Sequence, residues 1–561
     1  MSRRLCEGAR PMSRIIVESC VTQMPDGVGL LADLTLADDR RAHPALLVRT
    51  PYGRAEAMAQ VDAVELARAG WAVVVQSVRG RGGSGGVFNP FLQEGDDGDA
   101  TIRWCCQQPW SDGRVAMSGA SYAGITQWKC ALAKPKGLKA ISPQITASDV
   151  GEDWFYEGGA FRHAFIQSWG VSFAFTDETN REAQTLARRI AADLAGLYRS
   201  APARSPLAEI FPPYLRWREP TDKALWDECR GLHRREPPDI PAFHLAGWYD
   251  IFCEGGLRDY ASMREGAPSD YARARQRLLI GPWTHTALFS QQAGEWDHGL
   301  QANGYVLDVM GEMHGWLRRV LDDEEVEGGA RVFVLGSDEW LELKTWPPPR
   351  ADLRRLYLDA ERGANGLQGD GRLRWSPAEK AGSDSFRYDP ANPVPTRGGR
   401  NLDPTLPGPG PLDQQQLEQR ADLLVYTSDV MEEELCVMGI VRAEIIFETS
   451  GRSADVVVKL VDVHPDGRAL QVLCSALRTE FTAHDPQLVR VNVGNIAITF
   501  RRGHRVRVEI ASSNFPHLDL NPSTGQASTR ALDFEAADQK VYRGARSPSF
   551  IELPVVDPQR I

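Results

Sequence analysis

Residues 114–128, RVAMSGASYAGITQW, place a serine among small residues where an apolar run gives way to a helical pattern. The run RVAMSG (114–119) is typical of a buried strand, and YAGITQWKCALA (122–133) of the helix after it. When a strand turns sharply into a helix, the turn residue is strained and its side chain projects above the sheet. Small neighbours are needed there, because bulk would collide with the strand or the helix. The pattern therefore predicts a nucleophile elbow at Ser121, with the amide of Tyr122 at the helix N-terminus as a candidate oxyanion donor.

The spacing of the glycines leaves an alternative open. The common elbow pattern is G-x-S-x-G, whereas here Gly119 stands two places before Ser121 and the second glycine, Gly124, comes one place late, after Ala123. A serine before a helix is also a frequent N-cap, whose side chain accepts a hydrogen bond from the first turn. On spacing alone, both interpretations stay open.

Strand and helix patterns alternate around this stretch. Buried-strand runs occur at 45–49, 71–78 and 138–144, with helical patterns at 57–70 and 99–108 between them. Alternation with short connections predicts a parallel sheet that is covered on both faces by helices.

The alternation divides the chain into four predicted segments. They are an α/β-hydrolase core at 13–145 and 239–350, an inserted helical cap without a clear strand at 146–238, and a C-terminal all-β domain at 351–561. The core begins with a β-hairpin at 13–36. The strict period of two in the last segment predicts a sandwich with a solvated face on each sheet.

The composition excludes several classes of protein. A net charge of -11 over 561 residues disfavours nucleic acid as a partner, because phosphate contacts rely on clustered Lys and Arg. The short basic clusters at 79–81 and 501–505 are set among acids, and we expect solvated surface there. No apolar run of the ~18 residues that span a membrane is present, so no membrane partner is expected.

Nine cysteines without a C-x-x-C pair indicate neither a zinc site nor a disulfide framework. We therefore expect no metal and no other cofactor, mostly buried thiols, and a reducing, cytoplasmic location. The N-terminus is basic but lacks the apolar core of a signal peptide. Met1 and Met12 both stay open as the true start, since regular alternation begins only after Met12.

Two later strand ends carry the partners that a nucleophilic serine needs. An unaided hydroxyl is a poor nucleophile, and in this fold its acid and base follow in the order Ser, Asp, His. The strand at 241–247 leads to Asp250, and the strand at 277–283 leads to His285. Because parallel sheets carry their chemistry at the carboxyl ends of the strands, Ser121, Asp250 and His285 are the predicted catalytic triad.

Other motifs compete less well for a function. His298 is the one rival base, while His244 lies inside its strand and is expected to be a packed core residue. The G-x-G-x-x-G pattern at 80–85 is followed by Pro90 rather than by a helix, which favours a loop beside the active site over cofactor binding. The acidic run at 94–99 suits the dipole of a helix start better than a metal ion.

Three motifs together carry a family resemblance. GASYAG (119–124), GWYDIF (247–252) and IGPWTH (280–285) resemble the cocaine-esterase-like (CocE/NonD) serine hydrolases, which are related to α-amino-acid ester hydrolases and X-prolyl dipeptidyl peptidases. The resemblance covers nearly the whole chain and implies a jelly-roll-like C-terminal domain. It also implies Ser121 as nucleophile, Asp250 as orienting acid and His285 as base.

The resemblance implies further site residues. Tyr52 would complete the oxyanion hole with its hydroxyl, beside the Tyr122 amide; taken alone, Tyr52 is a loop aromatic in a turn. Trp154, Trp169 and Phe252 would form the acyl pocket, with ordinary packing of the cap as the alternative.

Substrate class depends on charge in this family. Amino-ester hydrolases keep an acidic pair two and three places beyond the triad aspartate, where this chain has Phe252 and Cys253. The predicted activity is therefore cleavage of a small-molecule carboxylic ester with a neutral acyl group. Carboxylates of the cap keep an amide- or peptide-cleaving relative open: Asp149, Glu152, Asp153 and Glu157. A carbohydrate-binding protein on a disused hydrolase scaffold, and assembly into a homo-oligomer, also stay open.

Overall fold

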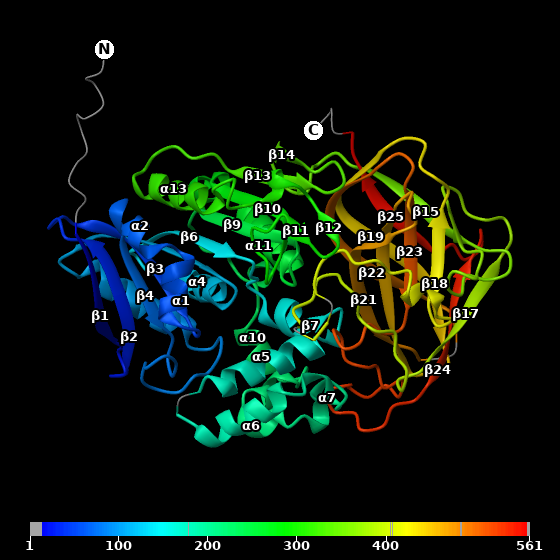
Figure 1. Cartoon of the computed structure of the whole chain (residues 1–561), viewed down its shortest axis with the longest axis horizontal. Coiled ribbons are helices and arrows are strands. Elements are labelled where there is room, and N and C mark those ends of the chain that lie inside the picture. Colours follow the sequence, from blue (N-terminus) through cyan, green and yellow to red (C-terminus); the bar gives the residue numbers. More distant parts are fainter. Residues whose placement is uncertain (1–13, 178, 404, 407, 483–484, 558–561) are drawn as a thin grey trace, which may run out of the picture.

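The computed structural model describes residues 14–177, 179–403, 405–406, 408–482 and 485–557 (Figure 1). In this view a mixed sheet with its helices lies on the left, an all-β domain lies on the right, and a helical segment lies below and between them. The choice between Met1 and Met12 falls outside the described residues. None of the described helices has the length and apolar character needed to cross a membrane.

The mixed sheet has ten strands in the order β1-β2-β4-β3-β5-β6-β9-β10-β13-β14. Their bounds are β1 (Ile15–Gln23), β2 (Gly29–Ala37), β3 (His43–Thr50), β4 (Ala72–Ser77), β5 (Ser111–Ala120), β6 (Leu138–Gln144), β9 (Ala242–Tyr249), β10 (Gln276–Thr284), β13 (Gly329–Val334) and β14 (Glu339–Leu343). The strands from β4 to β13 are parallel, and an antiparallel strand or hairpin closes each end. The predicted N-terminal hairpin and parallel sheet are confirmed.

Helices cover both faces of this sheet. They are α1 (Arg54–Gln60), α2 (Ala63–Arg68), α3 (Glu94–Cys106), α4 (Tyr122–Leu132), α11 (Cys253–Gly266), α12 (Asp270–Ala274) and α13 (Val309–Leu321), with a short turn η4 (Leu300–Ala302) and a small hairpin of β11 (Gln292–Ala293) and β12 (Trp296–Asp297). Leu46 and Val48 of β3 pack in the core that contains α13, whereas Leu47 packs in the core that contains α4. Successive side chains of a strand point to opposite faces, so β3 is buried throughout.

The prediction of one continuous helix at 57–70 is wrong. Asp62 adopts a left-handed conformation with φ 51°, which ends α1 and starts α2. Its side chain accepts a hydrogen bond from the Glu65 N–H and so caps the second helix. A helical period in the sequence does not reveal such a break, because the apolar face continues through it.

The segment between β6 and β9 is mainly helical. It contains η1 (Gly151–Phe155), α5 (His163–Phe175), α6 (Arg181–Ala191), α7 (Leu194–Tyr198), η2 (Pro202–Arg204), α8 (Leu207–Ile210), α9 (Tyr214–Trp217), α10 (Lys223–Glu228) and η3 (Leu232–Arg234). The expectation of no strand is corrected by a tight hairpin of β7 (Tyr156–Glu157) and β8 (Ala160–Phe161), which Gly158 and Gly159 turn with positive φ.

This hairpin is bonded to the all-β domain. The Arg478 N–H donates to the Gly158 carbonyl at 2.8 Å, and a Cβ at Gly158 would lie 1.9 Å from the Ala476 carbonyl oxygen. The Phe161 N–H donates to Asp519 Oδ1 at 3.0 Å, while the Asp519 N–H donates back to the Phe161 carbonyl. The cap and the all-β domain are therefore joined through main-chain hydrogen bonds.

The C-terminal domain is all-β, as predicted. Its strands are β15 (Asp352–Asp359), β16 (Arg372–Arg374), β17 (Gly382–Tyr388), β18 (Leu424–Ser428), β19 (Leu435–Thr449), β20 (Ser453–Val463), β21 (Ala469–Glu480), β22 (Gln487–Phe500), β23 (Arg505–Ala511), β24 (Ala537–Arg543) and β25 (Phe550–Val555), with a short turn η5 (Leu417–Gln419). Hydrogen bonds join these strands into one network, and the main apolar core of the domain continues into the neighbouring strands of the mixed sheet.

The expectation of a solvated face on each sheet is wrong for β20, which is buried along its whole length. Its inward side chains join the domain core, while Val457 on its other face is covered by Val394, Leu417 and Leu518 from irregular segments. The strict alternation of the sequence arises from charged side chains that are buried in pairs; Lys459, for example, lies 3.2 Å from Glu509.

Candidate active site

Ser121 occupies the turn between β5 and α4, with φ 57° and ψ -120°. A Cβ at Gly119 would lie 2.7 Å from the Ala123 Cβ, and one at Gly124 would lie 2.4 Å from Thr146 Cγ2. Both positions therefore require glycine, because a side chain would collide with its neighbours. The second glycine stands at 124 rather than 123 because position 124 packs against Thr146, in the segment that follows β6. Ser121 makes no capping hydrogen bond with its side chain, which leaves the hydroxyl available.

The three residues predicted from strand ends meet above the sheet. His285 Nε2 lies 3.1 Å from Ser121 Oγ, and His285 Nδ1 lies 2.6 Å from Asp250 Oδ2. Asp250 follows β9 and is fully buried, with its other oxygen accepting the Phe252 N–H at 2.7 Å. Because the buried carboxylate accepts the Nδ1–H, Nε2 is left as the acceptor that faces the serine hydroxyl.

The competing histidines have other partners. His298 is buried, with Nδ1 2.8 Å from Asp338 Oδ1 and its ring stacked on Trp296. His244 lies within β9 at 3.1 Å from Gln276, and burial lowers its pKa to about 4. Within the described structure neither ring is hydrogen-bonded to Ser121, so His285 is the histidine beside the nucleophile candidate.

Two donors surround the Ser121 hydroxyl. The Tyr122 N–H is the first of α4, where the helix supplies no acceptor. Tyr52 follows β3, and its hydroxyl accepts the Trp169 Nε1–H at 3.1 Å. Burial around this hydroxyl raises the pKa of Tyr52, while its hydrogen bonds to Trp169 and Ser121 act in the opposite direction. Tyr52 therefore stays protonated at neutral pH and can donate.

The side chain of Tyr122 points away from this site into a buried network. Its hydroxyl donates to Glu94 Oε1 at 2.9 Å and accepts the Phe91 N–H at 2.9 Å. Glu94 also lies 2.9 Å from the fully buried guanidinium of Arg49. The acidic run at the start of α3 thus does more than suit the helix dipole, because it neutralises a buried arginine behind the elbow.

A cavity of about 810 Å³, the Ser121 cavity, opens over Ser121 and His285. Its wall includes apolar and aromatic side chains (Tyr52, Phe173, Leu288, Phe289, Tyr305 and Met310) and neutral polar ones (Gln60, Ser172, Thr176 and Thr286). Glu56 and Arg81 are the charged side chains on the described part of this wall. Gln144, at the carboxyl end of β6, also lines it and could have been found by the same strand-end rule that found Asp250.

Arg81 explains the glycine-rich loop. Its guanidinium donates to the Pro51 carbonyl at 3.3 Å and to the Phe173 carbonyl at 3.2 Å, so the loop connects the sheet to cap helix α5. Because Arg81 and Gly82 also line the cavity, the loop lies beside the site, as predicted from Pro90.

The three aromatic residues expected in the acyl pocket lie behind this wall. Trp154 is fully buried and packs on Phe252 at 4.2 Å between ring centroids. Phe252 contacts the His285 ring edge-on at 5.3 Å, and Trp169 holds the hydroxyl of Tyr52. The structure therefore places Trp154, Trp169 and Phe252 in a layer that supports the site residues, and contact with an acyl group stays a prediction.

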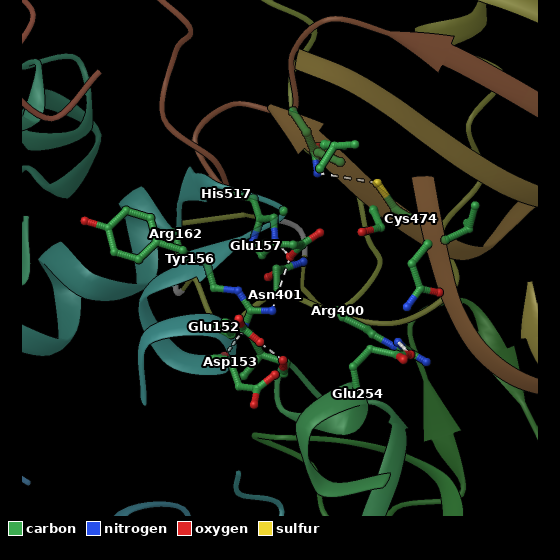
Figure 2. A pocket seen from close by; sticks show the side chains of 18 of the residues that line it. Glu152, Asp153, Tyr156, Glu157, Arg162, Glu254, Arg400, Asn401, Cys474 and His517 are labelled. Carbon is green, nitrogen blue, oxygen red and sulfur yellow. Dashed lines mark hydrogen bonds and ion pairs between the residues drawn. The ribbon is translucent and has the colours of Figure 1, made fainter. Parts of the chain in front are cut away.

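Three of the four cap carboxylates, Glu152, Asp153 and Glu157, line a second cavity, the Figure 2 cavity (Figure 2). It measures about 360 Å³ and lies between the cap, α11 and the all-β domain. Glu157 lies 3.1 Å from His517 and 3.3 Å from Arg162, and Asp153 is paired with Arg258. Asp149 accepts backbone N–H groups, from Glu152 at 2.8 Å and Gly231 at 2.9 Å.

Arg400 crosses the same cavity from the all-β domain. It is paired with Glu254 of α11 and donates to the Trp248 carbonyl at 2.8 Å and to the Asn495 carbonyl at 2.7 Å. Among the described residues, the two cavities share no lining residue. The cap carboxylates thus bind other groups of the protein, and none of them lines the cavity that contains Ser121.

Comparison with known proteins agrees with this geometry. The family model for X-Pro dipeptidyl-peptidase (S15 family) matches residues 26–287, and that for the X-Pro dipeptidyl-peptidase C-terminal non-catalytic domain matches residues 324–552. Over 96% of the chain, the sequence is 32% identical to cocaine esterase from Rhodococcus sp., of which the match covers 98%. The chain belongs to the cocaine-esterase-like (CocE/NonD) family of serine hydrolases.

Solved structures show the same fold as this CocE/NonD hydrolase. An aminopeptidase from a marine sediment Thaumarchaeota archaeon superposes with a TM-score of 0.82 at 23% identity, covering 99% of each chain. An α-amino acid ester hydrolase superposes with a TM-score of 0.79 at 24% identity, covering 99% of this chain and 98% of that one. The predicted family, fold class and enzyme class are confirmed, and the binding-protein alternative is set aside.

Proposed function

We propose that this CocE/NonD hydrolase cleaves small-molecule carboxylic esters through an acyl-enzyme on Ser121. The observation that supports this proposal is the chain of hydrogen bonds from Ser121 through His285 to Asp250, at the edge of the Ser121 cavity. His285 Nε2 takes the hydroxyl proton as Oγ attacks the carbonyl carbon. The buried Asp250 carboxylate orients the ring and stabilises the imidazolium that forms.

The oxyanion of the tetrahedral intermediate accepts hydrogen bonds from the Tyr52 hydroxyl and the Tyr122 N–H. Each such donor contributes about 3 kcal/mol to stabilisation of the transition state. The imidazolium of His285 then gives its proton to the leaving alkoxide, and the alcohol departs. Water, deprotonated by the same ring, attacks the acyl-enzyme and releases the carboxylic acid.

A neutral, hydrophobic or aromatic acyl group suits the site best. Phe252 and Cys253 replace the acidic pair that an amine-selective relative keeps, and both are buried. Apart from Glu56, Arg81 and the triad histidine, the described wall of the Ser121 cavity is lined by neutral side chains, several of them apolar or aromatic, whereas Asp153 and Glu157 are paired with cations in the other cavity. A substrate ammonium group would find few free carboxylates near Ser121.

An amide- or peptide-cleaving activity is the second candidate. It is favoured by the match of the S15 dipeptidyl-peptidase model to residues 26–287, since the same triad chemistry cleaves amides.

For the chain as a whole, we propose a boundary at 350/351 between the hydrolase core, with its cap at 146–238, and a jelly-roll-like domain. The start of β15 at Asp352 supports it, although the C-terminal family match begins at 324 and includes strands of the mixed sheet.

A cytoplasmic location is part of the proposal, because the eight described cysteines are free thiols.

Hydrolysis of p-nitrophenyl esters of graded acyl length by the purified protein, beside a Gly-Pro anilide, tests the proposal. We expect ester turnover to exceed anilide turnover, and we expect Ser121→Ala to reduce kcat/KM by at least about 10⁵-fold, because removal of a triad nucleophile leaves only oxyanion and binding effects. Inertness towards every ester, or full activity of the alanine variant, would disprove ester hydrolysis at Ser121. Preference for the anilide would establish the second candidate instead.

A further inference from the structure

A histidine–aspartate cluster lies in the all-β domain, at the end of β20 and remote in sequence from the triad. Asp462 is the second-last residue of β20, His464 follows the strand directly, and His504 directly precedes β23. The two strands are paired here, with Asp462 opposite Val506 and Val463 opposite Arg505. Strand pairing therefore fixes the backbone of all three side chains before any ligand is considered.

The three side chains converge on one point. Asp462 Oδ1 lies 2.9 Å from His504 Nδ1, and Asp462 Oδ2 lies 3.4 Å from His464 Nε2. One ligand atom from each residue lies within 4.8 Å of the other two. Ligands of a tetrahedral zinc ion at 2.0–2.1 Å are separated by roughly 3.3 Å, so the observed spacing needs only small rotations to close on a cation.

One ring nitrogen in the cluster lacks a hydrogen bond. Within the described structure, His464 Nε2 is inaccessible to solvent and makes no hydrogen bond of good geometry, and Asp462 at 3.4 Å is its charged neighbour. His504 and Asp462 are also buried. The Trp296 ring of β12 packs edge-on against His464 at 5.6 Å between centroids, which limits the motion of that imidazole.

The arginine side chains close in sequence to the cluster bind other groups. Arg468 is paired with Asp466 at 2.8 Å, Arg505 donates to the Ser428 carbonyl at 2.9 Å, and Arg501 is bonded to the Gly336 carbonyl. The cluster thus holds one carboxylate and two imidazoles without an arginine at its centre, which is a ligand set suited to zinc and its neighbours among the divalent transition metals.

We propose that Asp462, His464 and His504 bind a divalent transition-metal ion of the Zn²⁺ type, with a water molecule or another exogenous ligand in the fourth position. The ion ties the β20 end to the start of β23 and stabilises this corner of the all-β domain. The sequence contains no C-x-x-C or H-x-x-x-H pattern here; its only sign is the Asp462-x-His464 spacing at a strand end, with His504 inside a basic cluster.

A second cluster provides the contrast. Asp149, Glu152 and His233 also bring three candidate ligand atoms within 4.8 Å. However, Glu152 is paired with Arg234 and with Arg258 at 3.4 Å. Two guanidinium groups at this cluster compete directly with a metal cation, so His233 serves as a matched control.

The test is isothermal titration of Zn²⁺ into chelator-treated full-length protein, with metal content measured by mass spectrometry after dialysis. The wild type is compared with Asp462→Asn, His464→Gln and His233→Gln. All four proteins carry the same cysteines, so any binding by thiols is common to them. Circular dichroism and the thermal unfolding midpoint verify that each variant is folded; His464 is half-buried directly after β20.

We expect the wild type and His233→Gln to bind one Zn²⁺ with the same affinity and to unfold at a higher temperature when zinc is present. Asp462→Asn and His464→Gln should bind at least about tenfold more weakly and lose the zinc-dependent shift in midpoint. Absence of saturable binding by the wild type would overturn the proposal. So would equal binding by wild type and the folded His464→Gln variant, whatever the behaviour of Asp462→Asn.

Discussion

The two cavities differ in how charge is arranged. The wall of the Ser121 cavity is lined mainly by neutral side chains, with one hydrogen-bonded chain of polar groups at its base, whereas the Figure 2 cavity is lined by acids and bases already paired with each other. Paired charges have little left to offer a substrate, because their hydrogen bonds and ion pairs are used within the protein. The contrast indicates that the density of titratable groups alone would not have pointed to the proposed active site.

The difference in arrangement predicts a difference in response to mutation. Changes at the Ser121 cavity should lower turnover and leave the fold intact. Changes at the Figure 2 cavity should lower stability and leave turnover intact, because its pairs join the cap, α11 and the all-β domain. The variants below are ordered from the largest expected effect to the smallest.

Asp250→Asn should lower kcat about 10⁴-fold. An amide of the same size keeps the hydrogen bond from the Phe252 N–H but presents an NH₂ group to His285, which favours the wrong tautomer of the ring. Steady-state kinetics on a p-nitrophenyl ester measures the loss, with the thermal midpoint as control for folding. A variant within tenfold of wild type would remove Asp250 from the proposed triad.

Tyr52→Phe should lower kcat by about 10²–10³-fold with little change in KM. The ring keeps its packing against Phe173, stacked at 6.1 Å, while the donor to the proposed oxyanion is lost. Because burial raises the pKa of Tyr52, the wild-type donor stays protonated and its contribution should not decline between pH 7 and pH 9. A fall in wild-type activity over that range that is absent from Tyr52→Phe would contradict this role.

Glu157→Gln should destabilise the protein by about 3 kcal/mol at pH 7 and leave kcat of the folded enzyme unchanged. Although burial opposes it, the hydrogen bond from His517 and the charges of His517 and Arg162 lower the pKa of Glu157 from 4.5 to about 2.

A lowered folded-state pKa gives stability that is fully present above the unfolded value of 4.5 and is lost as pH falls towards 2. The difference between wild type and Glu157→Gln in unfolding midpoint should therefore shrink between pH 5 and pH 2. A difference that stays constant with pH would show that the carboxylate charge is not responsible, and a large loss of kcat would break the contrast between the two cavities.

Trp169→Phe should lower kcat by about 2–10-fold. The substitution keeps an aromatic ring in the supporting layer but removes the indole N–H that donates to the Tyr52 hydroxyl, a hydrogen bond worth about 1 kcal/mol. Combining it with Tyr52→Phe should add no further loss, since the indole acts through that hydroxyl. Additive losses in the double variant would instead indicate direct contact of Trp169 with substrate.

The elbow and the strand ends were predictable because local rules determine them. A buried strand, a required glycine and the carboxyl-edge rule lead to Ser121, Asp250 and His285 without knowledge of the rest of the chain. The cavity wall was not predictable in this way. Phe289 and Tyr305 come from the irregular segment after His285, and such loops have no period that reports where they lie.

Burial of charge was the other feature that the pattern concealed. The alternation of β20 resembles a half-solvated strand, yet Lys459 is buried on the face that irregular segments cover and Asp462 is buried on the opposite face. Their partners, Glu509 and His504, lie more than forty residues away in the sequence, so only the fold reveals the pairing. The same reason hid the partners of the cap carboxylates.

The glycine hairpin of the cap limits how the enzyme can exchange substrate and product. Movement of this hairpin away from the all-β domain would break the hydrogen bond between Gly158 and Arg478. It would also break the two hydrogen bonds between Phe161 and Asp519. We therefore expect substrate to enter and product to leave through an entrance that stays open without movement of the cap. The rate of turnover should then be set by the chemical step or by diffusion rather than by opening of a lid.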